Sequence, residues 1–324
     1  MTTPTASIGP LRVTRQGFGA MGLSHSYGQA DEAESLRTLD RVVELGINFI
    51  DTADVYGNGH NEELLARWFK GRRDQLVIAT KFGNRRGTGV RSPDGRPEYV
   101  RQAIEASLKR LKVDHVDLYY LHRLDRQTPI EETVGELARL QAEGKIRGIG
   151  LSEVDSATLR RAQATAPIAA LQSEYSLWTR EIEADILPTA RELGVAFVAY
   201  SPLGRGFLAG QVPTEAGDRR NEHPRFQAEA VEANSRRRAV IEAVAGRLGA
   251  TSAQVALAWV LSKGVIPIPG TRHVKHLESN WAANDIVLDA ATVGELEAAF
   301  PPGSTVGARF PAGAAWVPNL AAAG

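Results

Sequence analysis

The chain has 324 residues, of which 43% are hydrophobic and 23% are charged, and it contains no cysteine. Its 38 basic residues balance its 38 acidic ones, which argues against a nucleic acid or a membrane surface as the main partner. The lack of cysteine excludes disulfides and thiolate metal sites. We expect a cytoplasmic protein, because the start lacks a secretory signal and no apolar run approaches the roughly 18 residues of a membrane span.

Short apolar runs recur along the chain and predict buried strands of a parallel sheet. The first run is brief and covers residues 16–19, and longer runs begin near residues 47, 76, 116, 146, 168, 195 and 265. Amphipathic segments lie between the runs and predict helices. Such helices are expected at residues 32–45, 97–111, 182–193, 236–248, 273–283 and 289–299. Another should begin at residues 128–131, where Thr128 and Glu131 form a capping box around Pro129.

The alternation of strands and helices predicts an α/β fold, namely a (β/α)8 TIM barrel in a single domain over residues 1–324. A doubly wound parallel sheet is the alternative. The first fifteen residues are expected to form an N-terminal hairpin across the barrel floor, with its turn near residues 8–11. A C-terminal helix should lead into a tail from Pro301 that packs irregularly or frays.

One connection is unusually long, the rim loop of about residues 202–235. It is rich in Gly, Pro, Arg and Asn, and loops of this length in compact domains are commonly lids or disordered segments. We expect this loop to be too polar to pack as core and to act as a lid over a bound ligand.

Three polar residues stand where predicted strands end. Asp51, Lys81 and His122 follow the apolar runs that begin near residues 47, 76 and 116, and Tyr56 comes shortly after Asp51. In a parallel α/β barrel, catalytic groups collect at the carboxyl ends of the strands. We therefore expect these four side chains to meet at one rim.

Their chemistry suits proton donation to an oxygen atom. A phenol holds its proton at neutral pH because its pKa is about 10, and a nearby ammonium makes it a better acid by stabilising the phenolate. Asp51 could supply the pair that a buried Lys81 needs, while His122 orients a carbonyl oxygen. This set protonates an oxygen while a hydride arrives at its carbon, and no G-x-S-x-G nucleophile motif is present.

With these residues in place, the chain resembles the aldo-keto reductases over about residues 5–300. Residues 46–57 resemble the Asp-to-Tyr signature of that family, and the segments around Lys81 and His122 match its next two motifs. The segments 149–152, 200–204 and 268–272, together with Gln172, follow in the family's order. The stretches near 201–206 and 269–272 look more like the branch containing pyridoxal reductases and potassium-channel β-subunits.

The resemblance implies NADPH-dependent reduction of an aldehyde or ketone to the alcohol. Tyr56 would be the general acid, Asp51 and Lys81 its tuning pair, and His122 the residue that orients the carbonyl. The implied NADP(H) contacts run along the rim: Gly19 and Met21 at the ribose, Asp51, Ser152 and Gln172 near the carboxamide, Tyr200 stacked on the nicotinamide, Ser201, Leu203 and Arg205 at the pyrophosphate, and Gly270, Thr271, Arg272, His276 and Asn280 around the 2′-phosphate and adenine. Arg272 suits the 2′-phosphate because its planar fork matches phosphate oxygens.

Three positions depart from the family pattern. Glu153 stands where asparagine is usual, which puts one carboxamide contact in doubt because a carboxylate cannot donate a hydrogen bond. Ser279 replaces a frequent glutamate beside Asn280, which weakens the expected contact to the adenine amino group. His276 stands where some members carry arginine, so the phosphate contact depends more heavily on Arg272.

Other interpretations remain open. The glycines at 17, 19 and 22 match a dinucleotide fingerprint as a string, but no strand and helix frame them, so we expect them to let the backbone approach a ligand. His273 and His276 have metal-ligand spacing without a third ligand, and no metal is expected. A redox-sensing regulatory subunit that holds NADP(H) but turns over slowly is one alternative function, and a barrel isomerase or metal-dependent hydrolase is another. The sequence indicates a small carbonyl substrate without identifying it, and it leaves the oligomeric state unknown.

Overall fold

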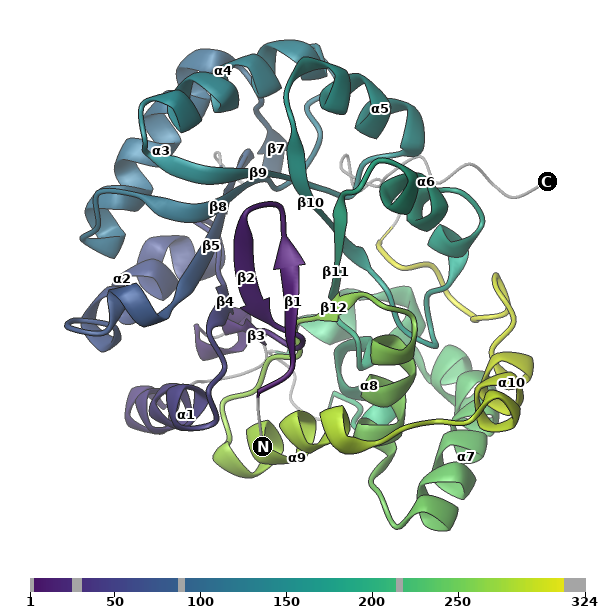
Figure 1. The fold of residues 1–324 in the computed structure, drawn as a ribbon. Helices are drawn as coiled ribbons and strands as arrows, with labels where there is room; N and C mark the ends of the chain where they lie inside the picture. The colour runs from purple at the N-terminus through teal and green to yellow at the C-terminus, as the bar shows by residue number, and fades with distance from the viewer. Residues whose placement is uncertain (1–2, 25–30, 87–90, 214–217, 312–324) are drawn as a thin grey trace.

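The computed structural model describes residues 3–24, 31–86, 91–213 and 218–311 (Figure 1). Within them the elements follow in the order β1 (Thr5–Ile8), β2 (Leu11–Thr14), β3 (Phe18–Gly19), α1 (Glu32–Glu44), β4 (Phe49–Asp51), α2 (His60–Trp68), β5 (Val77–Phe82), β6 (Asn84–Arg86), β7 (Arg91–Pro93), α3 (Pro97–Leu111), β8 (Val116–Leu121), α4 (Ile130–Ala142), β9 (Ile146–Ser152), α5 (Ser156–Thr165), β10 (Ile168–Glu174), α6 (Ile186–Glu192), β11 (Ala196–Tyr200), α7 (Ala228–Leu248), α8 (Ser252–Ser262), β12 (Ile266–Pro267), α9 (Val274–Trp281) and α10 (Ala290–Ala299).

A parallel sheet forms the centre of the molecule. Its strand order in the described residues is β3, β4, β5, β8, β9, β10, β11 and β12. The two edge strands meet, because the Gly17 N–H donates to the Pro267 carbonyl at 3.0 Å and the Gly19 N–H to the Pro269 carbonyl at 3.2 Å. The sheet thus curls into a barrel with helices on its outside (Figure 1). The predicted (β/α)8 fold is confirmed, and the doubly wound alternative is wrong.

Glycines permit this closure. A Cβ atom on Gly270 would lie 2.4 Å from the Gly19 carbonyl oxygen, and one on Gly19 would lie 2.8 Å from the Ile268 oxygen. A Cβ on Gly17 would lie 2.6 Å from the Phe49 ring. These contacts are shorter than any side chain tolerates, so strand packing requires Gly17 and Gly19. The prediction that these glycines serve approach to a ligand was therefore incomplete.

The amino end of the barrel is covered by a hairpin, as predicted. β1 and β2 pair antiparallel, with Ile8 opposite Leu11, and lie across the barrel opening (Figure 1). Ile8, Leu11 and Val13 are buried together with side chains of the barrel interior, among them Phe49. The hairpin closes this end with apolar packing, so a ligand must enter from the opposite rim.

The predicted helices are present in the structure, but the prediction was incomplete. α8 was missed because its central residues are buried on every side and leave no amphipathic stripe; α2 and α5 were also missed. α7 begins at Ala228 rather than at residue 236. The capping box was wrong, because Pro129 occupies the N-cap position of α4 without a side-chain bond and the Thr128 hydroxyl donates to Asp125 instead, at 2.7 Å.

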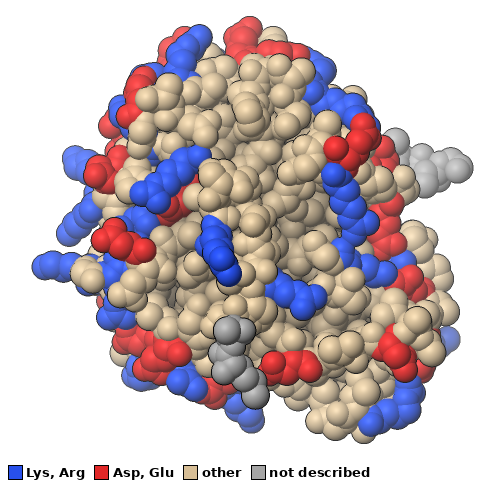
Figure 2. Space-filling model, in the orientation of Figure 1, with Lys and Arg blue, Asp and Glu red and all other residues tan. Residues whose placement is uncertain are grey.

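Charges of both signs are dispersed over the hairpin face of the molecule, without a large patch of one sign (Figure 2). In the described part of the chain, no single helix is long and apolar enough to cross a membrane. The pair α7 and α8, bent by 95°, meets the length and composition of a span only when taken together.

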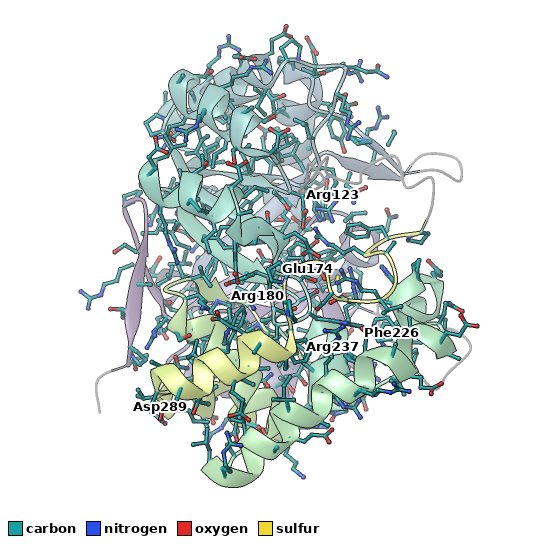
Figure 3. All side chains as sticks on the ribbon, turned by 90° about the vertical axis from the view of Figure 1, so that its right-hand side faces the viewer. Arg123, Glu174, Arg180, Phe226, Arg237 and Asp289 are labelled. Carbon is teal, nitrogen blue, oxygen red and sulfur yellow. The ribbon has the colours of Figure 1, made fainter. Side chains whose placement is uncertain are left out.

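The long rim loop contains more buried structure than its composition suggests. Phe207 and Phe226 are buried and pack on Trp178, with ring centroids 4.2 and 5.5 Å away; Phe226 lies where α7 begins (Figure 3). The prediction that this segment is too polar to join the core was therefore wrong. Movement of the rim loop as a lid stays a prediction, and residues 214–217 of the loop lie outside the described residues.

Candidate active site at the carboxyl-end rim

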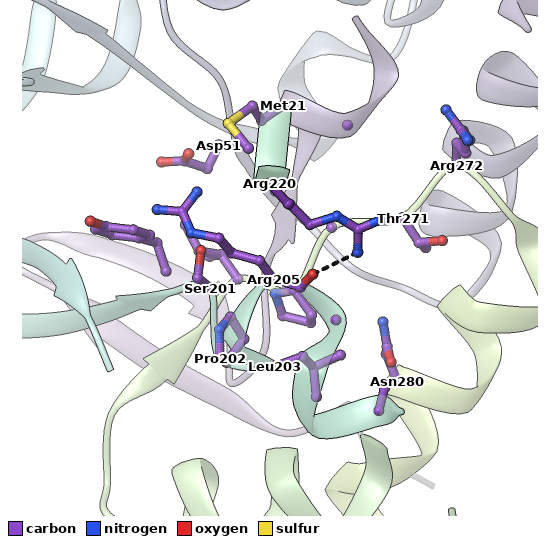
Figure 4. Close-up of a pocket in the computed structure, with 18 of the residues that line it drawn as sticks. Met21, Asp51, Ser201, Pro202, Leu203, Arg205, Arg220, Thr271, Arg272 and Asn280 are labelled. Atoms are coloured by element: carbon purple, nitrogen blue, oxygen red, sulfur yellow. Dashed lines mark hydrogen bonds between the residues drawn. The ribbon is translucent and has the colours of Figure 1, made fainter. Parts of the chain in front are cut away.

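A cavity of about 1160 Å³ opens at the carboxyl ends of the strands. Figure 4 shows Asp51 and Met21 at one side, Arg272, Thr271 and Asn280 at the other, and Ser201, Leu203 and Arg205 between them. The structure places every predicted site residue except Lys81 on the cavity wall: Gly19, Met21, Asp51, Tyr56, His122, Ser152, Gln172, Tyr200, Ser201, Leu203, Arg205, Gly270, Thr271, Arg272, His276 and Asn280. Lys81 lies directly behind this wall.

The four candidate catalytic residues meet because neighbouring strands end together. Asp51 is the last residue of β4, Lys81 lies near the end of β5, and His122 directly follows β8. Tyr56 begins the 3-10 turn Tyr56–Gly59 that leads into α2. Since β4, β5 and β8 are adjacent and parallel, the polar side chains at their ends reach the same point of the rim.

Lys81 is the centre of this group and is fully buried. Its ammonium pairs with Asp51 and donates to the Thr52 carbonyl at 2.8 Å. The Tyr56 hydroxyl oxygen accepts a longer bond from it at 3.4 Å. Gln172 Nε2 donates to the second Asp51 oxygen at 2.7 Å. The buried pair therefore has the additional hydrogen bonds without which burial of two charges is unfavourable.

The ionisation of Tyr56 is governed by two opposing effects. Burial raises the pKa of the Tyr56 phenol, and Lys81 lowers it by less, so the pKa ends above its ordinary value. Burial acts to lower the pKa of Lys81, but the Asp51 carboxylate and Tyr56 together raise it. At neutral pH the phenol is protonated and the lysine is charged, which are the states that proton donation needs.

His122 stands edge-on to Tyr56. The ring centroids are 5.9 Å apart with an interplanar angle of 86°. The His122 N–H donates to the Phe82 carbonyl at 2.7 Å, which fixes the backbone at the rim. The two side chains therefore border the same part of the cavity.

Amide and hydroxyl groups continue the wall beyond Asp51. Because Gln172 Nε2 is bonded to Asp51, the carbonyl oxygen of Gln172 is the end that is left to accept. Ser152 Oγ accepts from Arg123 Nη1 at 3.3 Å, so its own hydroxyl proton can be donated elsewhere. Tyr200, at the end of β11, also lines this part of the cavity.

The middle of the wall has an unusual backbone. Ser201, Gly204, Arg205 and Gly206 all have positive φ, at 49°, 56°, 55° and 96°. Backbone N–H groups in tight turns can form concavities that bind anions, although the Gly204 and Gly206 N–H groups already donate to the Ser201 and Leu203 carbonyls. The Arg205 guanidinium lies close by (Figure 4). The backbone carbonyl of Arg205 accepts a hydrogen bond from Arg220 Nη1 at 3.0 Å.

The far end of the cavity is basic. Thr271, Arg272, Lys275 and His276 gather at the start of α9, and the Arg272 carbonyl accepts from Thr38 Oγ1 at 2.9 Å. Asn280 is buried, and the neighbouring Ser279 contacts Thr251 at 3.5 Å. This concentration of basic groups favours an anionic ligand group.

Sequence reasoning missed several residues of the site, of which Arg309 is the most important. Its side chain is buried at the rim and pairs with Glu153 at 2.6 Å, and the adjacent Phe310 lines the cavity. Residues 304–311 pack irregularly, as predicted for the tail from Pro301, and residues 312–324 lie outside the described residues. The only local signal was a lone arginine in an apolar tail.

No metal centre is built by the described residues, in which no group of three His, Asp or Glu side chains could hold an ion. The rings of His273 and His276 do meet, with centroids 5.3 Å apart. His273 Nδ1, however, lies 2.6 Å from a carboxylate oxygen of Glu34.

Asp54, just before the catalytic turn, supports a prediction about pH. One of its carboxylate oxygens is buried without a hydrogen-bond partner in the described structure. Burial, with a smaller effect from Glu62, raises the pKa of Asp54 to about 7 from its ordinary 3.8. Because the folded pKa is the higher one, this group costs stability increasingly as pH rises from about 4 to 7.

We therefore expect Asp54→Asn to raise the melting temperature at pH 8 by more than at pH 5. Thermal melts at both values test this, with the exposed Asp74→Asn as the control for loss of one carboxylate. An equal gain at the two pH values would contradict the argument.

Comparison with known proteins agrees with the geometry. Residues 16–300 match the aldo/keto reductase family. The chain is 47% identical to "Probable aldo-keto reductase 1" of Glycine max, covering 93% of this chain and 89% of that protein. It is 42% identical to "Aldo-keto reductase yakc [NADP(+)]" of Schizosaccharomyces pombe, covering 97% and 96%.

Solved structures give the same result. The glycerol dehydrogenase AKR11B4 from Gluconobacter oxydans superposes with a TM-score of 0.83 at 30% identity, covering 93% of this chain and 97% of that one. The holo form of the aldo-keto reductase AKR11C1 from Bacillus halodurans superposes with a TM-score of 0.75 at 27% identity, covering 92% and 97%.

Proposed function

Because the chain belongs to the aldo/keto reductase family, whose members are NADP-dependent carbonyl oxidoreductases, we propose that it reduces an aldehyde or ketone to the alcohol with Tyr56 as the proton donor. The observation that carries this proposal is the contact of the Tyr56 hydroxyl with the Lys81 ammonium at 3.4 Å, in a cavity that His122 also lines. Bound NADPH supplies the hydride.

The protein's own residues move the proton. Tyr56 starts protonated because burial raises its pKa. As its proton passes to the carbonyl oxygen, negative charge develops on the phenol oxygen, where the Lys81 ammonium stabilises it. His122 donates to the same carbonyl oxygen and orients it. Asp51 keeps Lys81 charged and in place.

The order of chemical groups along the cavity supports this use of the cofactor. The Gln172 carbonyl and the Ser152 hydroxyl offer an acceptor and a donor for the nicotinamide carboxamide, and the ring of Tyr200 offers a stacking surface. The positive-φ segment 201–206 with Arg205 suits the pyrophosphate, and Gly19 and Met21 border the ribose. Thr271, Arg272, His276, Gly270 and Asn280 would surround the 2′-phosphate and adenine.

Replacing Arg272 should affect NADPH far more than NADH. A charge-assisted hydrogen bond contributes about 1.5–3 kcal/mol, or roughly ten- to a hundredfold in affinity. We expect Arg272→Ala to weaken the affinity for NADPH by about this factor and to leave the affinity for NADH almost unchanged, as measured by fluorescence titration. Arg67→Ala makes the same change in charge on the outside of the barrel, where Arg67 pairs with Glu32, and should change neither affinity. Equal losses for both cofactors would show that Arg272 does not contact the 2′-phosphate.

The reaction itself is tested by NADPH oxidation over a panel of aldehydes, diketones, quinones and pyridoxal, with identification of the alcohol product. Carbonyl-dependent oxidation is expected. Tight NADPH binding without turnover on any carbonyl would instead favour a regulatory subunit that senses the redox state of the cofactor.

A further inference from the structure

A cluster of buried charges lies beneath the proposed nicotinamide end of the site. Glu153 follows β9, Glu174 ends β10, and both carboxylates are buried. Arg309 reaches them from the C-terminal segment, while Arg205 and Arg225 approach from the rim loop. Figure 3 shows Glu174 and Phe226 beside this C-terminal segment, drawn in yellow.

Arg309 joins three strand ends. Its Nη2 donates to Glu153 Oε1 at 2.6 Å and to the Tyr200 hydroxyl oxygen at 3.3 Å. Its Nε lies 3.4 Å from Glu174 Oε2. The Glu153 carboxylate, which lies near the Tyr200 hydroxyl, accepts in addition from the Glu174 N–H at 3.0 Å. The guanidinium therefore bonds the phenol directly and holds the carboxylate beside it.

Several contacts hold the backbone of the C-terminal segment in place next to Arg309. The Gly307 carbonyl accepts from Arg225 Nε at 3.1 Å, and a Cβ on Gly307, whose φ is +90°, would lie 2.9 Å from the Arg225 backbone. Asn234 and Val306 exchange two hydrogen bonds of 3.0 Å each. The Arg309 carbonyl lies 2.9 Å from His223 Nδ1. These contacts thus hold the backbone of residues 304–309 in the position from which the Arg309 side chain reaches the two carboxylates.

The charges explain why Glu153 can occupy this position. Burial works against both carboxylates, yet Arg309, with smaller effects from neighbouring arginines, lowers the pKa of Glu153 and brings the pKa of Glu174 to about 2. Glu153 does not line the cavity, so it acts from behind the wall, on Tyr200 and Arg309. This resolves the departure at residue 153: the side chain supports the site without contacting a ligand.

We propose that Arg309 is a positioning residue for the nicotinamide end of the site, acting through Glu153 and the hydroxyl of Tyr200 to hold the Tyr200 ring as the stacking surface. The backbone of Tyr200 is fixed by β11 and its hydroxyl is held by the arginine, so the direction in which the ring extends over the cavity wall is fixed. This inference rests on the proposed use of NADP(H). It makes Arg309 part of the cofactor site, although Arg309 itself does not line the cavity.

Two ligands separate positioning from general support of the fold. NADP⁺ carries the nicotinamide, and 2′-phospho-ADP-ribose is the same molecule without it. Arg309→Lys keeps a charge beside Glu153, but it cannot place one nitrogen at Glu153 and Tyr200 and a second at Glu174, as the planar guanidinium does with Nη2 and Nε. We expect this substitution to weaken the affinity for NADP⁺ by about three- to tenfold, which is the value of a lost aromatic stacking contact. The affinity for 2′-phospho-ADP-ribose should change by less than about twofold.

Arg180→Lys is the matched control. Arg180 is also buried and also ties the C-terminal region to the barrel, but its bonds go to Glu183 and to the carbonyls of Glu297 and Phe300. The Arg180→Lys variant should have a lower melting temperature, but the ratio of its affinities for NADP⁺ and 2′-phospho-ADP-ribose should not change. Tyr200→Phe removes only the hydroxyl, so it should reproduce the ratio change of Arg309→Lys, and the double variant should show no further change.

The outcomes are distinguishable. A ratio that stays at the wild-type value in Arg309→Lys overturns the inference, as do equal losses for both ligands or additive effects of the Arg309 and Tyr200 variants. If the wild-type protein binds neither ligand, the proposed cofactor use fails, and this inference fails with it. The wild-type titration shows that result before any variant is made.

Discussion

Tyr56→Phe should lower kcat for carbonyl reduction by about 10²–10⁴-fold, the usual contribution of a positioned general acid. The substitution removes the hydroxyl that contacts Lys81 and leaves the ring in place beside His122. No other phenol on the cavity wall of the described structure lies against the ammonium, since the Tyr200 hydroxyl accepts from Arg309 instead. Affinity for NADPH should remain close to the wild-type value.

Tyr119→Phe provides the control for this loss. Tyr119 is a buried phenol of β8 that stacks on Phe82 with centroids 4.8 Å apart, among side chains packed outside the barrel. Its hydroxyl is buried and takes no part in the cavity. Steady-state kinetics with a reactive aldehyde compares the two variants, and near wild-type kcat in Tyr56→Phe would remove Tyr56 from the role of proton donor.

Lys81→Met should reduce both activity and stability. The phenol loses the charge that stabilises its anion, so turnover should fall about as far as in Tyr56→Phe. Asp51 is then left buried with Gln172 as its remaining hydrogen-bond partner. Leaving one member of a buried ion pair unmatched costs about 3–5 kcal/mol of unfolding free energy. Denaturant unfolding and kinetics on the same preparation measure the two effects.

Lys145→Met is the matched surface variant. Lys145 pairs with Glu105 where both side chains are partly exposed, and such a pair contributes only about 0–1 kcal/mol. Adding Asp51→Asn to Lys81→Met should recover part of the lost stability, because the unmatched charge is removed, but none of the activity. A Lys81→Met protein that is inactive and unfolds like the wild type would show that the buried pair does not stabilise the fold.

Much of the site could be predicted because its signals are local. Asp51, Lys81 and His122 each interrupt an apolar run at its end, and a parallel sheet brings the ends of neighbouring strands together whatever the loops do. α8 and the capping of α4 were not predictable in the same way. A helix buried on all sides shows no periodic pattern, and Thr128 had a competing partner, Asp125, whose position the loop determines.

Contacts between distant segments were beyond the sequence alone. Nothing near residue 153 indicates that its carboxylate meets an arginine 156 positions later, and composition alone made residues 301–324 look like a loose tail. Likewise, the polar composition of the rim loop does not indicate that Phe207 and Phe226 pack on Trp178.

The sequence by itself therefore determined the barrel, the end of the barrel where the cavity opens, and the polar side chains that gather there, because strand periodicity and strand-end polarity are encoded within a few residues. Only the tertiary structure decided how those side chains are held. Gly19 had to meet Gly270 to close the sheet, and Arg309 had to come from the tail to neutralise Glu153. Such pairings depend on the three-dimensional path of the whole chain, and burial then makes each one costly to lose.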